Sequence, residues 1–230
     1  MRNTTILFDI DQTLLYSGGA GSRAMRQAFA QLYGIEDGFK RVEFSGRTDW
    51  SILRNAMQQH GLLDGHDEGH FRQEMARFQE RYYELLPVAL RQAEGGHAMP
   101  GVSELLDALS EHSEARLGLA TGNFRRAASL KLSHFALDRH LTEGGFGDDA
   151  EDRGALVGKA IERVSGSDAG TVWVIGDTPL DVQAAQANNA RALGVATGPC
   201  TVAELLAVGA SAALEDLSDT AAVLETLFGG

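Results

Sequence analysis

Cysteine is almost absent from this chain of 230 residues, and its one cysteine, Cys200, has no second thiol to pair with. An intramolecular disulfide and a zinc site built on cysteine ligands are therefore excluded. The chain is nevertheless long enough to be held together by a hydrophobic core. Because so little cysteine favours a reducing compartment, we expect a cytoplasmic location.

Positive charge is also in deficit. The 20 lysine and arginine residues are outnumbered by 32 aspartate and glutamate residues, which leaves a formal net charge of −12. A chain with this excess of negative charge is not attracted over long range to nucleic acid or to an anionic membrane surface. We therefore expect neither as a partner, and an anionic ligand would have to be bound by locally placed positive groups.

Long apolar runs are missing as well. The first apolar stretch, at residues 6–8, is interrupted by Asp9 before it reaches the length of the hydrophobic region of a secretory signal. No stretch approaches the roughly 20 apolar residues that a membrane-spanning helix needs. We therefore expect neither export by that route nor insertion into a membrane.

Short apolar runs that end in polar residues are present instead, and they predict buried strands. These runs lie at residues 6–8, 117–120, 172–175 and 192–195, with a shorter candidate at 211–214. Apolar residues at helical spacing lie between them, at 102–109 and 156–164. Strands and helices in alternation imply a doubly wound, Rossmann-like α/β core, in which a parallel sheet is covered on both faces.

Residues 16–95 follow a different pattern, because their apolar residues have helical spacing and no convincing strand lies among them. We interpret this segment as an inserted all-helical domain, with residues 1–15 and 96–230 forming the α/β core. Paired glycines at 18–19 and 95–96 tolerate wide backbone angles, which suits a two-stranded hinge. Ordinary loops explain the glycines equally well.

Acidic residues gather where two of the predicted strands end. Asp9 and Asp11 follow the first strand, and Asp177 and Asp181 follow the strand at 172–175. If the next helix starts at Asp177, Asp181 lies one turn further on the same side. Two carboxylates about 4 Å apart repel by on the order of 4 kcal/mol, so a cation or a shared proton must accompany them. Four such oxygen donors favour a Mg²⁺ site, while a capped helix start is the alternative for the first pair.

A hydroxyl and a positive charge complete the set of predicted site residues. Thr121 ends the strand at 117–120, so its hydroxyl and the N–H groups of the following turn could bind phosphate oxygens or simply cap a helix. A phosphoryl transition state spreads negative charge over its oxygens and therefore needs a cation. Arg153 and Lys159 are the candidates in the relevant stretch.

In this order and strand context, the residues make the chain similar to the haloacid dehalogenase superfamily. The resemblance is to its Mg²⁺-dependent phosphatases with a helical cap inserted after the first strand, as in phosphoglycolate phosphatase-like proteins. It covers essentially the whole chain. The family motif Asp-x-Asp-x-Thr is matched by Asp9, Asp11 and Thr13, the second-motif Thr or Ser by Thr121, and Gly-Asp-x-x-x-Asp by residues 176–181.

The resemblance implies a phosphoryl transfer in two steps. Asp9 would attack phosphorus to form an aspartyl-phosphate, which water would then hydrolyse. Asp11 would be the general acid for the leaving group and then the base for that water. Mg²⁺ would be held by the Asp9 carboxylate, the main-chain carbonyl of Asp11 and Asp177, with Asp181 in direct contact or just behind. Thr121 would bind the phosphoryl group.

The third motif of the family departs from its usual Lys-Pro form in this chain. Arg153 is preferred as the cation of this motif, because the start of a helix can aim it inward, and Lys159, further along that helix, is the alternative. Arg47 lies between glycine and threonine and is predicted to reach the substrate from the helical segment, although an ordinary surface arginine would look the same. Asn123 is expected to line the pocket.

Other functions share part of this pattern. A phosphomutase of the β-phosphoglucomutase type would use the same core residues and differ in returning the phosphoryl group to a sugar. A haloacid dehalogenase needs neither Asp11 nor the later acidic pair, and a non-enzymatic phospho-receiver is shorter and lacks the insertion. The resemblance therefore favours a Mg²⁺-dependent phosphatase that acts on a small phosphorylated metabolite, such as phosphoglycolate or a sugar phosphate. We expect a monomer or a homodimer.

Overall fold

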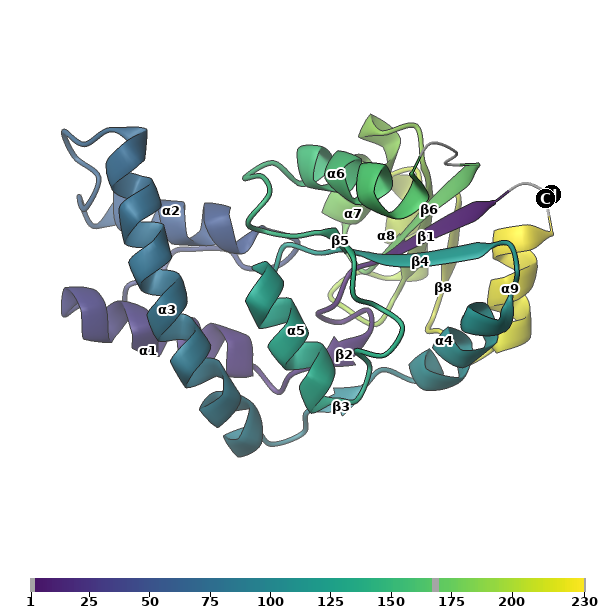
Figure 1. The fold of residues 1–230 in the computed structure, drawn as a ribbon, viewed down its shortest axis with the longest axis horizontal. Coiled ribbons are helices and arrows are strands. Elements are labelled where there is room, and N and C mark those ends of the chain that lie inside the picture. Colours follow the sequence, from purple (N-terminus) through teal and green to yellow (C-terminus); the bar gives the residue numbers. More distant parts are fainter. Residues whose placement is uncertain (1–2, 167–169, 230) are drawn as a thin grey trace.

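The computed structural model describes residues 3–166 and 170–229 of the chain. Within these residues the main sheet has six parallel strands in the order β5-β4-β1-β6-β7-β8 (Figure 1). They span Thr4–Phe8 (β1), Ala115–Ala120 (β4), Gly144–Gly145 (β5), Thr171–Gly176 (β6), Arg191–Val195 (β7) and Ala212–Leu214 (β8). All of them except β5 coincide with the apolar runs of the sequence, and the α/β class is confirmed.

From α4 onward, the helices alternate with these strands along the chain, whereas α1, α2 and α3 follow one another. They span Ala20–Tyr33 (α1), Asp49–Gln59 (α2), Glu68–Gln92 (α3), Val102–Glu111 (α4), Arg125–His134 (α5), Arg153–Ser165 (α6), Pro179–Ala187 (α7), Val202–Ala207 (α8) and Thr220–Phe228 (α9). None of the helices formed by the described residues is long and apolar enough to cross a membrane.

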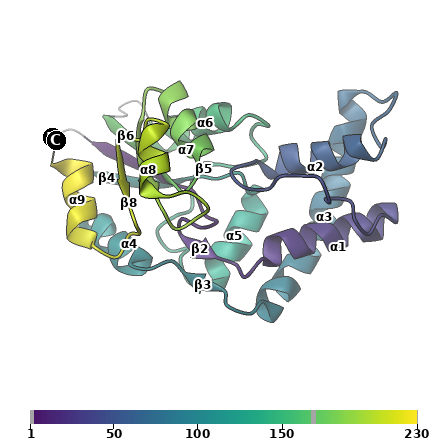
Figure 2. The ribbon, with the colours of Figure 1, turned by 180° about the vertical axis from the view of Figure 1, so that it is seen from behind.

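Helices cover both faces of the sheet, because successive side chains of a buried strand point to opposite faces. Ile6 and Phe8 of β1 pack into a core with α4, α5 and α9. Leu7, between them, packs on the other face with α6, α7 and α8. Figure 2 shows α8 and α9 from behind, on the two sides of the sheet. Since β1 lies between β4 and β6, the carboxyl ends of these three strands meet at one edge.

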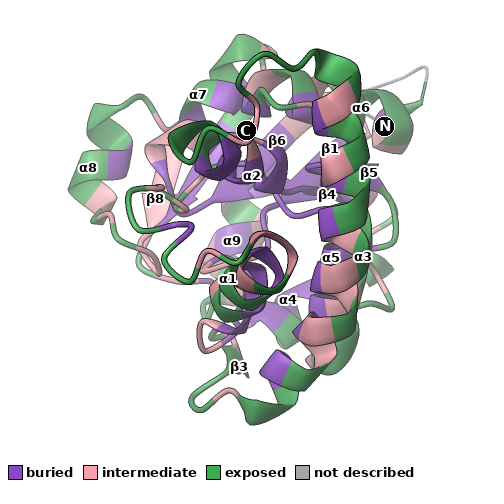
Figure 3. Cartoon of the chain, turned by 90° about the vertical axis from the view of Figure 1, so that its left-hand side faces the viewer, coloured by how far each residue is buried: buried purple, intermediate pink, exposed green. Residues whose placement is uncertain are grey.

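The helices α1, α2 and α3 form a second core beside this sheet edge (Figure 1). Its centre is aromatic, with Phe29 of α1 packed against Phe39 and with Phe78 of α3 nearby. Figure 3 shows that α3 exposes one side to solvent and buries the other, as its amphipathic sequence predicts. Phe124 and Ala127, at the start of α5, belong to the same core. The helical segment therefore packs against α5, a helix that also covers the sheet. The helical content agrees with the sequence interpretation, while the domain boundaries at 16 and 95 stay a prediction.

The two connections to the helical segment lie side by side. They carry the short strands Leu15–Tyr16 (β2) and His97–Ala98 (β3), which pair antiparallel. Gly18 has a φ of +60°, and a Cβ added there would lie 2.6 Å from the carbonyl oxygen of Glu94. Only glycine fits so close to the returning chain in this backbone conformation. Gly18 therefore allows the two connections to approach each other, and the action of the paired glycines as a hinge stays a prediction.

Candidate active site

Three buried carboxylates meet at the carboxyl ends of β1 and β6. Asp9 follows β1, Asp177 follows β6, and Asp181 lies in the first turn of α7. One oxygen from each lies within 4.8 Å of the others. Burial, partly opposed by a nearby arginine, raises the pKa of Asp9 to about 6. Burial and the other two carboxylates raise the pKa of Asp177 to about 8, because both disfavour its charged form.

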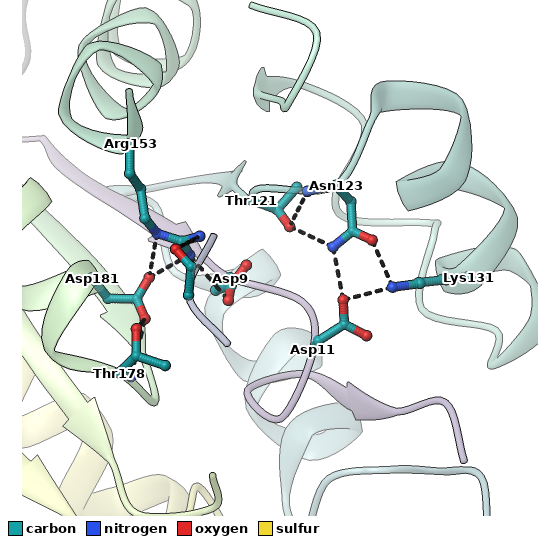
Figure 4. A network of polar contacts seen from close by, with 9 residues as sticks. Asp9, Asp11, Thr121, Asn123, Lys131, Arg153, Thr178 and Asp181 are labelled. Carbon is teal, nitrogen blue, oxygen red and sulfur yellow. Dashed lines mark hydrogen bonds and ion pairs between the residues drawn. The ribbon is translucent and has the colours of Figure 1, made fainter. Parts of the chain in front are cut away.

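Arg153 supplies positive charge to this cluster (Figure 4). It is the first residue of α6, and its guanidinium donates to Asp181 Oδ1 through Nε at 2.9 Å and also through Nη2. The same Nη2 lies 3.1 Å from Asp9 Oδ2. Burial alone would lower the pKa of Arg153, but the two carboxylates outweigh it and raise that pKa above its ordinary value. The arginine therefore stays charged beside the predicted nucleophile.

The two other cations predicted from the sequence, Lys159 and Arg47, lie outside the acidic cluster. Lys159 is exposed on the outer side of α6, where its Nζ is 3.1 Å from a Glu162 carboxylate oxygen, so the structure does not bring it to the site. Arg47 does line the cavity described below, with its side chain 46% exposed and its Nη2 3.4 Å from Glu43 Oε2. Of the two candidates for the third motif, Arg153 is thus the one that reaches the acidic cluster.

Asp181 is oriented by the start of α7. The helix begins at Pro179 with Thr178 as its N-cap, so the start at Asp177 suggested by the sequence is wrong and Asp177 lies outside the helix. Asp181 Oδ2 accepts hydrogen bonds from the Thr178 backbone N–H at 3.1 Å and hydroxyl at 2.7 Å, which forms a capping box. Its Oδ1 accepts from Arg153. Asp181 therefore faces protein donors, whereas Asp9 and Asp177 line the cavity.

The donor set of this cluster fits a hard divalent cation. Three buried carboxylates with only Arg153 beside them, among the described residues, leave an excess of negative charge that a cation would relieve. Carboxylate oxygens are the ligands that Mg²⁺ and similar ions prefer. Gly198 lies against Asp177, and a Cβ at Gly198 would collide with the Asp177 carboxylate. The glycine therefore leaves room for this carboxylate in its present position.

A second polar network surrounds Asp11 (Figure 4). The Nζ of Lys131 donates to Asp11 Oδ2 at 2.6 Å and to Asn123 Oδ1 at 2.6 Å. The Nδ2 of Asn123 donates to the same Asp11 oxygen at 2.8 Å and to Thr121 Oγ1 at 2.9 Å. Asp11 and Asn123 line the cavity, whereas Thr121 is fully buried behind Asn123. The structure thus brings these predicted residues together, with Thr121 one side chain further back.

Two buried charged residues at the cavity were missed by the sequence reasoning. Lys131 lies in the last turn of α5. Asp49 begins α2, and its carboxylate accepts a hydrogen bond from the Phe124 backbone N–H at 2.8 Å. Burial raises the pKa of Asp49 to about 7, although Lys131 opposes the rise. Neither residue follows a strand. Lys131 could have been found from its helical phase, because it shares the buried side of α5 with Ala127 and Ala128.

A cavity of about 490 Å³ connects these groups and lies between the sheet edge and the helical segment. Its sheet side is lined by Asp9, Asp11 and Asp177, and its helical side by Arg47, Asp49 and Tyr82 among others. Its size suits a small ligand with a few polar groups.

The loop before α2 and the first residue of α2 are hydrogen-bonded to the sheet side of this cavity. Arg153 Nη1 donates to the carbonyl of Gly46 at 3.1 Å. The backbone N–H of Asp49 donates to the carbonyl of Gly122 at 2.7 Å. The helical segment therefore contributes to the same cavity as the acidic cluster.

Comparisons with known proteins are consistent with this geometry. A model of the family described as haloacid dehalogenase-like hydrolase matches residues 6–195. A search of curated proteins finds no significant match.

Solved structures show the same fold over nearly the whole chain. One from Clostridium acetobutylicum, provisionally named a phosphatase, is 18% identical, with 98% of this chain and 100% of that chain covered and a TM-score of 0.68. One from Lactobacillus plantarum, provisionally named a phosphoglycolate phosphatase, is 23% identical, with 98% and 99% covered and a TM-score of 0.61. One from Thermotoga maritima, provisionally named a β-phosphoglucomutase, is 22% identical, with 98% and 100% covered and a TM-score of 0.57.

Proposed function

The chain belongs to the haloacid dehalogenase-like hydrolase family, and we propose that it is a Mg²⁺-dependent phosphatase that hydrolyses a small phosphomonoester through an aspartyl-phosphate. The observation that carries this proposal is the position of Asp9. Its carboxylate lies at the cavity, 3.1 Å from a guanidinium nitrogen of Arg153 and beside Asp177. A carboxylate so placed can act as a nucleophile without activation by a neighbouring base.

Each half of the reaction has a candidate group. An oxygen of Asp9 would bond to phosphorus while the bond from phosphorus to the leaving oxygen breaks, and Asp11 would give its proton to that oxygen. Water would then attack phosphorus, pass a proton to Asp11, and release inorganic phosphate and the free Asp9 carboxylate. Arg153 would stabilise the negative charge that develops on the phosphoryl oxygens. Asn123, which lines the cavity, would lie beside the same oxygens, with the buried Thr121 holding its amide from behind.

Asp9, Asp177 and the main-chain carbonyl of Asp11 would hold Mg²⁺, with Asp181 and Arg153 orienting this set from behind. When bound, the ion would supply positive charge that offsets the negative charge of the carboxylates and of the phosphoryl group. The leaving group would extend toward the helical side of the cavity, where Arg47, which lines that side, would contact it.

We expect Mg²⁺ to stabilise the folded protein, and to do so more at about pH 8 than at about pH 5. The pKa values of Asp9 and Asp177 are raised from 3.8 to about 6 and about 8. Between pH 3.8 and about 8 the folded state therefore holds protons that the unfolded state has released, so stability falls as pH rises. A cation that binds the ionised carboxylates offsets this loss.

Thermal unfolding with Mg²⁺ or with a chelator measures this effect. At about 100 times its dissociation constant the ion contributes about 2.7 kcal/mol, which is about 5 to 10 °C in the unfolding midpoint for a protein of this size. Asp177→Asn is the matched variant and should remove most of the Mg²⁺ effect. An equal or larger increase at the lower pH would contradict the expectation.

A phosphate-release screen tests the proposed function. The full chain is incubated with sugar phosphates, phosphoglycolate, nucleotides and phosphorylated amino acids, in Mg²⁺ or in chelator. We expect release of inorganic phosphate from at least one class, dependent on Mg²⁺. If none of these compounds yields phosphate or an isomeric product, the proposal is wrong.

A phosphomutase is the second candidate, because the fold is shared with the Thermotoga maritima protein that bears that provisional name. A mutase would convert one sugar phosphate into an isomer with little free phosphate. Analysis of the products in the same screen separates the two functions.

A further inference from the structure

Lys131 differs from the other two lysines of the chain. The side chains of Lys40 and Lys159 are 75% and 53% exposed, whereas that of Lys131 is 5% exposed. Burying a lysine costs up to about 2 kcal/mol in rotamer entropy, as well as much of the hydration of its ammonium group. An apolar residue would fill this position on the buried side of α5 without either cost. The contacts of the ammonium group must therefore account for the lysine.

Both hydrogen-bond acceptors of this ammonium group belong to the candidate site. Asp11 Oδ2 and Asn123 Oδ1 each lie 2.6 Å from Nζ, and the Asn123 amide donates back to the same Asp11 oxygen at 2.8 Å. The three side chains close a triangle in which Oδ2 of Asp11 is held by two donors from different parts of the fold (Figure 4). The other oxygen, Oδ1, accepts no hydrogen bond from the described residues, so it is available to a ligand in the cavity.

The helical segment holds the ammonium group from the opposite side. A Cβ on Gly21 of α1 would lie 3.2 Å from Nζ of Lys131 and 3.6 Å from the hydroxyl of Tyr82. Glycine within a helix costs up to about 1 kcal/mol relative to alanine, and here it leaves the space that the lysine head occupies. Because α1 lies against the ammonium group of this α5 residue, Lys131 has little freedom to leave Asp11.

We propose that Lys131 is a positioning residue for the hydrolytic reaction. Together with Asn123 it fixes Oδ2 of Asp11, so that Oδ1 points its proton at the leaving oxygen while Asp9 bonds to phosphorus and the bond to that oxygen breaks. The inference rests on the function proposed above, in which Asp11 is the general acid. A misplacement of about 1 Å in a reacting group can cost about 100-fold in rate, so loss of Lys131 affects the proton transfer selectively.

The test compares two substrates that differ in their need for a proton. An alkyl phosphate needs its leaving oxygen protonated, whereas an activated aryl phosphate expels a stable phenolate without a proton. Lys131→Met removes the ammonium group and keeps most of the side-chain volume. We expect kcat/KM to fall about 10- to 100-fold for the alkyl phosphate and by less than about threefold for the aryl phosphate. The matched control, Lys159→Met, should change neither value.

An equal loss on both substrates would overturn the proposal, because it would indicate a ligand of the phosphoryl group or general damage to the site. An unchanged kcat/KM for the alkyl phosphate would overturn it as well. Circular dichroism and thermal unfolding check that the variant folds, and Lys131→Gln takes its place in the same comparison if it does not. Absence of turnover by the unmodified protein on every phosphomonoester would instead contradict the proposed function itself, and the inference would fall with it.

Discussion

Replacing Asp9 with asparagine is expected to lower phosphate release by on the order of 10⁴-fold or more for every substrate that the unmodified protein hydrolyses. An amide has no anionic oxygen with which to attack phosphorus, so the aspartyl-phosphate cannot form. The substitution hardly changes the shape of the side chain, and Asp181 still pairs with Arg153. Phosphate release under saturating substrate and Mg²⁺ measures the loss.

The folding of Asp9→Asn separates a lost nucleophile from a lost structure. Burial raises the pKa of Asp9 to about 6, so its ionised form opposes folding above that pH. The variant should therefore melt no lower than the unmodified protein near pH 7 in the absence of Mg²⁺. Asp107→Asn, at an exposed carboxylate paired with Arg139 away from the cavity, is the control and should keep full activity. Full turnover by Asp9→Asn would exclude Asp9 as the nucleophile.

The parts of the candidate site at strand ends could be placed from the sequence. Asp9, Asp177 and Thr121 each follow an apolar run, and the structure makes these runs neighbouring strands β1, β6 and β4. Parallel strands that are neighbours must end at the same edge of the sheet, so residues distant in the chain meet there. The position of Arg153 followed from its place at a helix start near that edge.

The helical side of the site could not be placed in this way. Lys131 and Asp49 reach the cavity because of how α5 and α2 pack against the sheet edge, and the strand-end pattern that placed the other residues does not predict this packing. A lysine at helical spacing is usually an exposed residue, so only the buried alanines beside it hint at its position. The start of α7 could not be predicted to the residue either. Thr178 and Asp181 form a capping box there, so the helix begins two residues later than the motif suggests.

Arg153→Ala is the second change with a large expected effect. The arginine donates to Asp181 and lies 3.1 Å from Asp9, so its removal takes positive charge away from the oxygens where negative charge develops. Loss of one such preorganised group costs about 10²- to 10³-fold in kcat. It also leaves buried carboxylates without their partner, a change that costs about 3 to 5 kcal/mol of stability.

Two matched variants separate these effects. Arg153→Lys keeps a positive charge but cannot fork between Asp9 and Asp181, so it should recover much of the lost stability and less of the lost rate. Lys159→Ala lies on the same helix, and its loss removes only an exposed pair with Glu162, worth at most about 1 kcal/mol. We expect its kcat to stay within about twofold of the unmodified value, because an exposed pair so far from the acidic cluster places no charge on the phosphoryl group. If Lys159→Ala lowers kcat more than Arg153→Ala does, then Arg153 is not the cation that supports phosphoryl transfer.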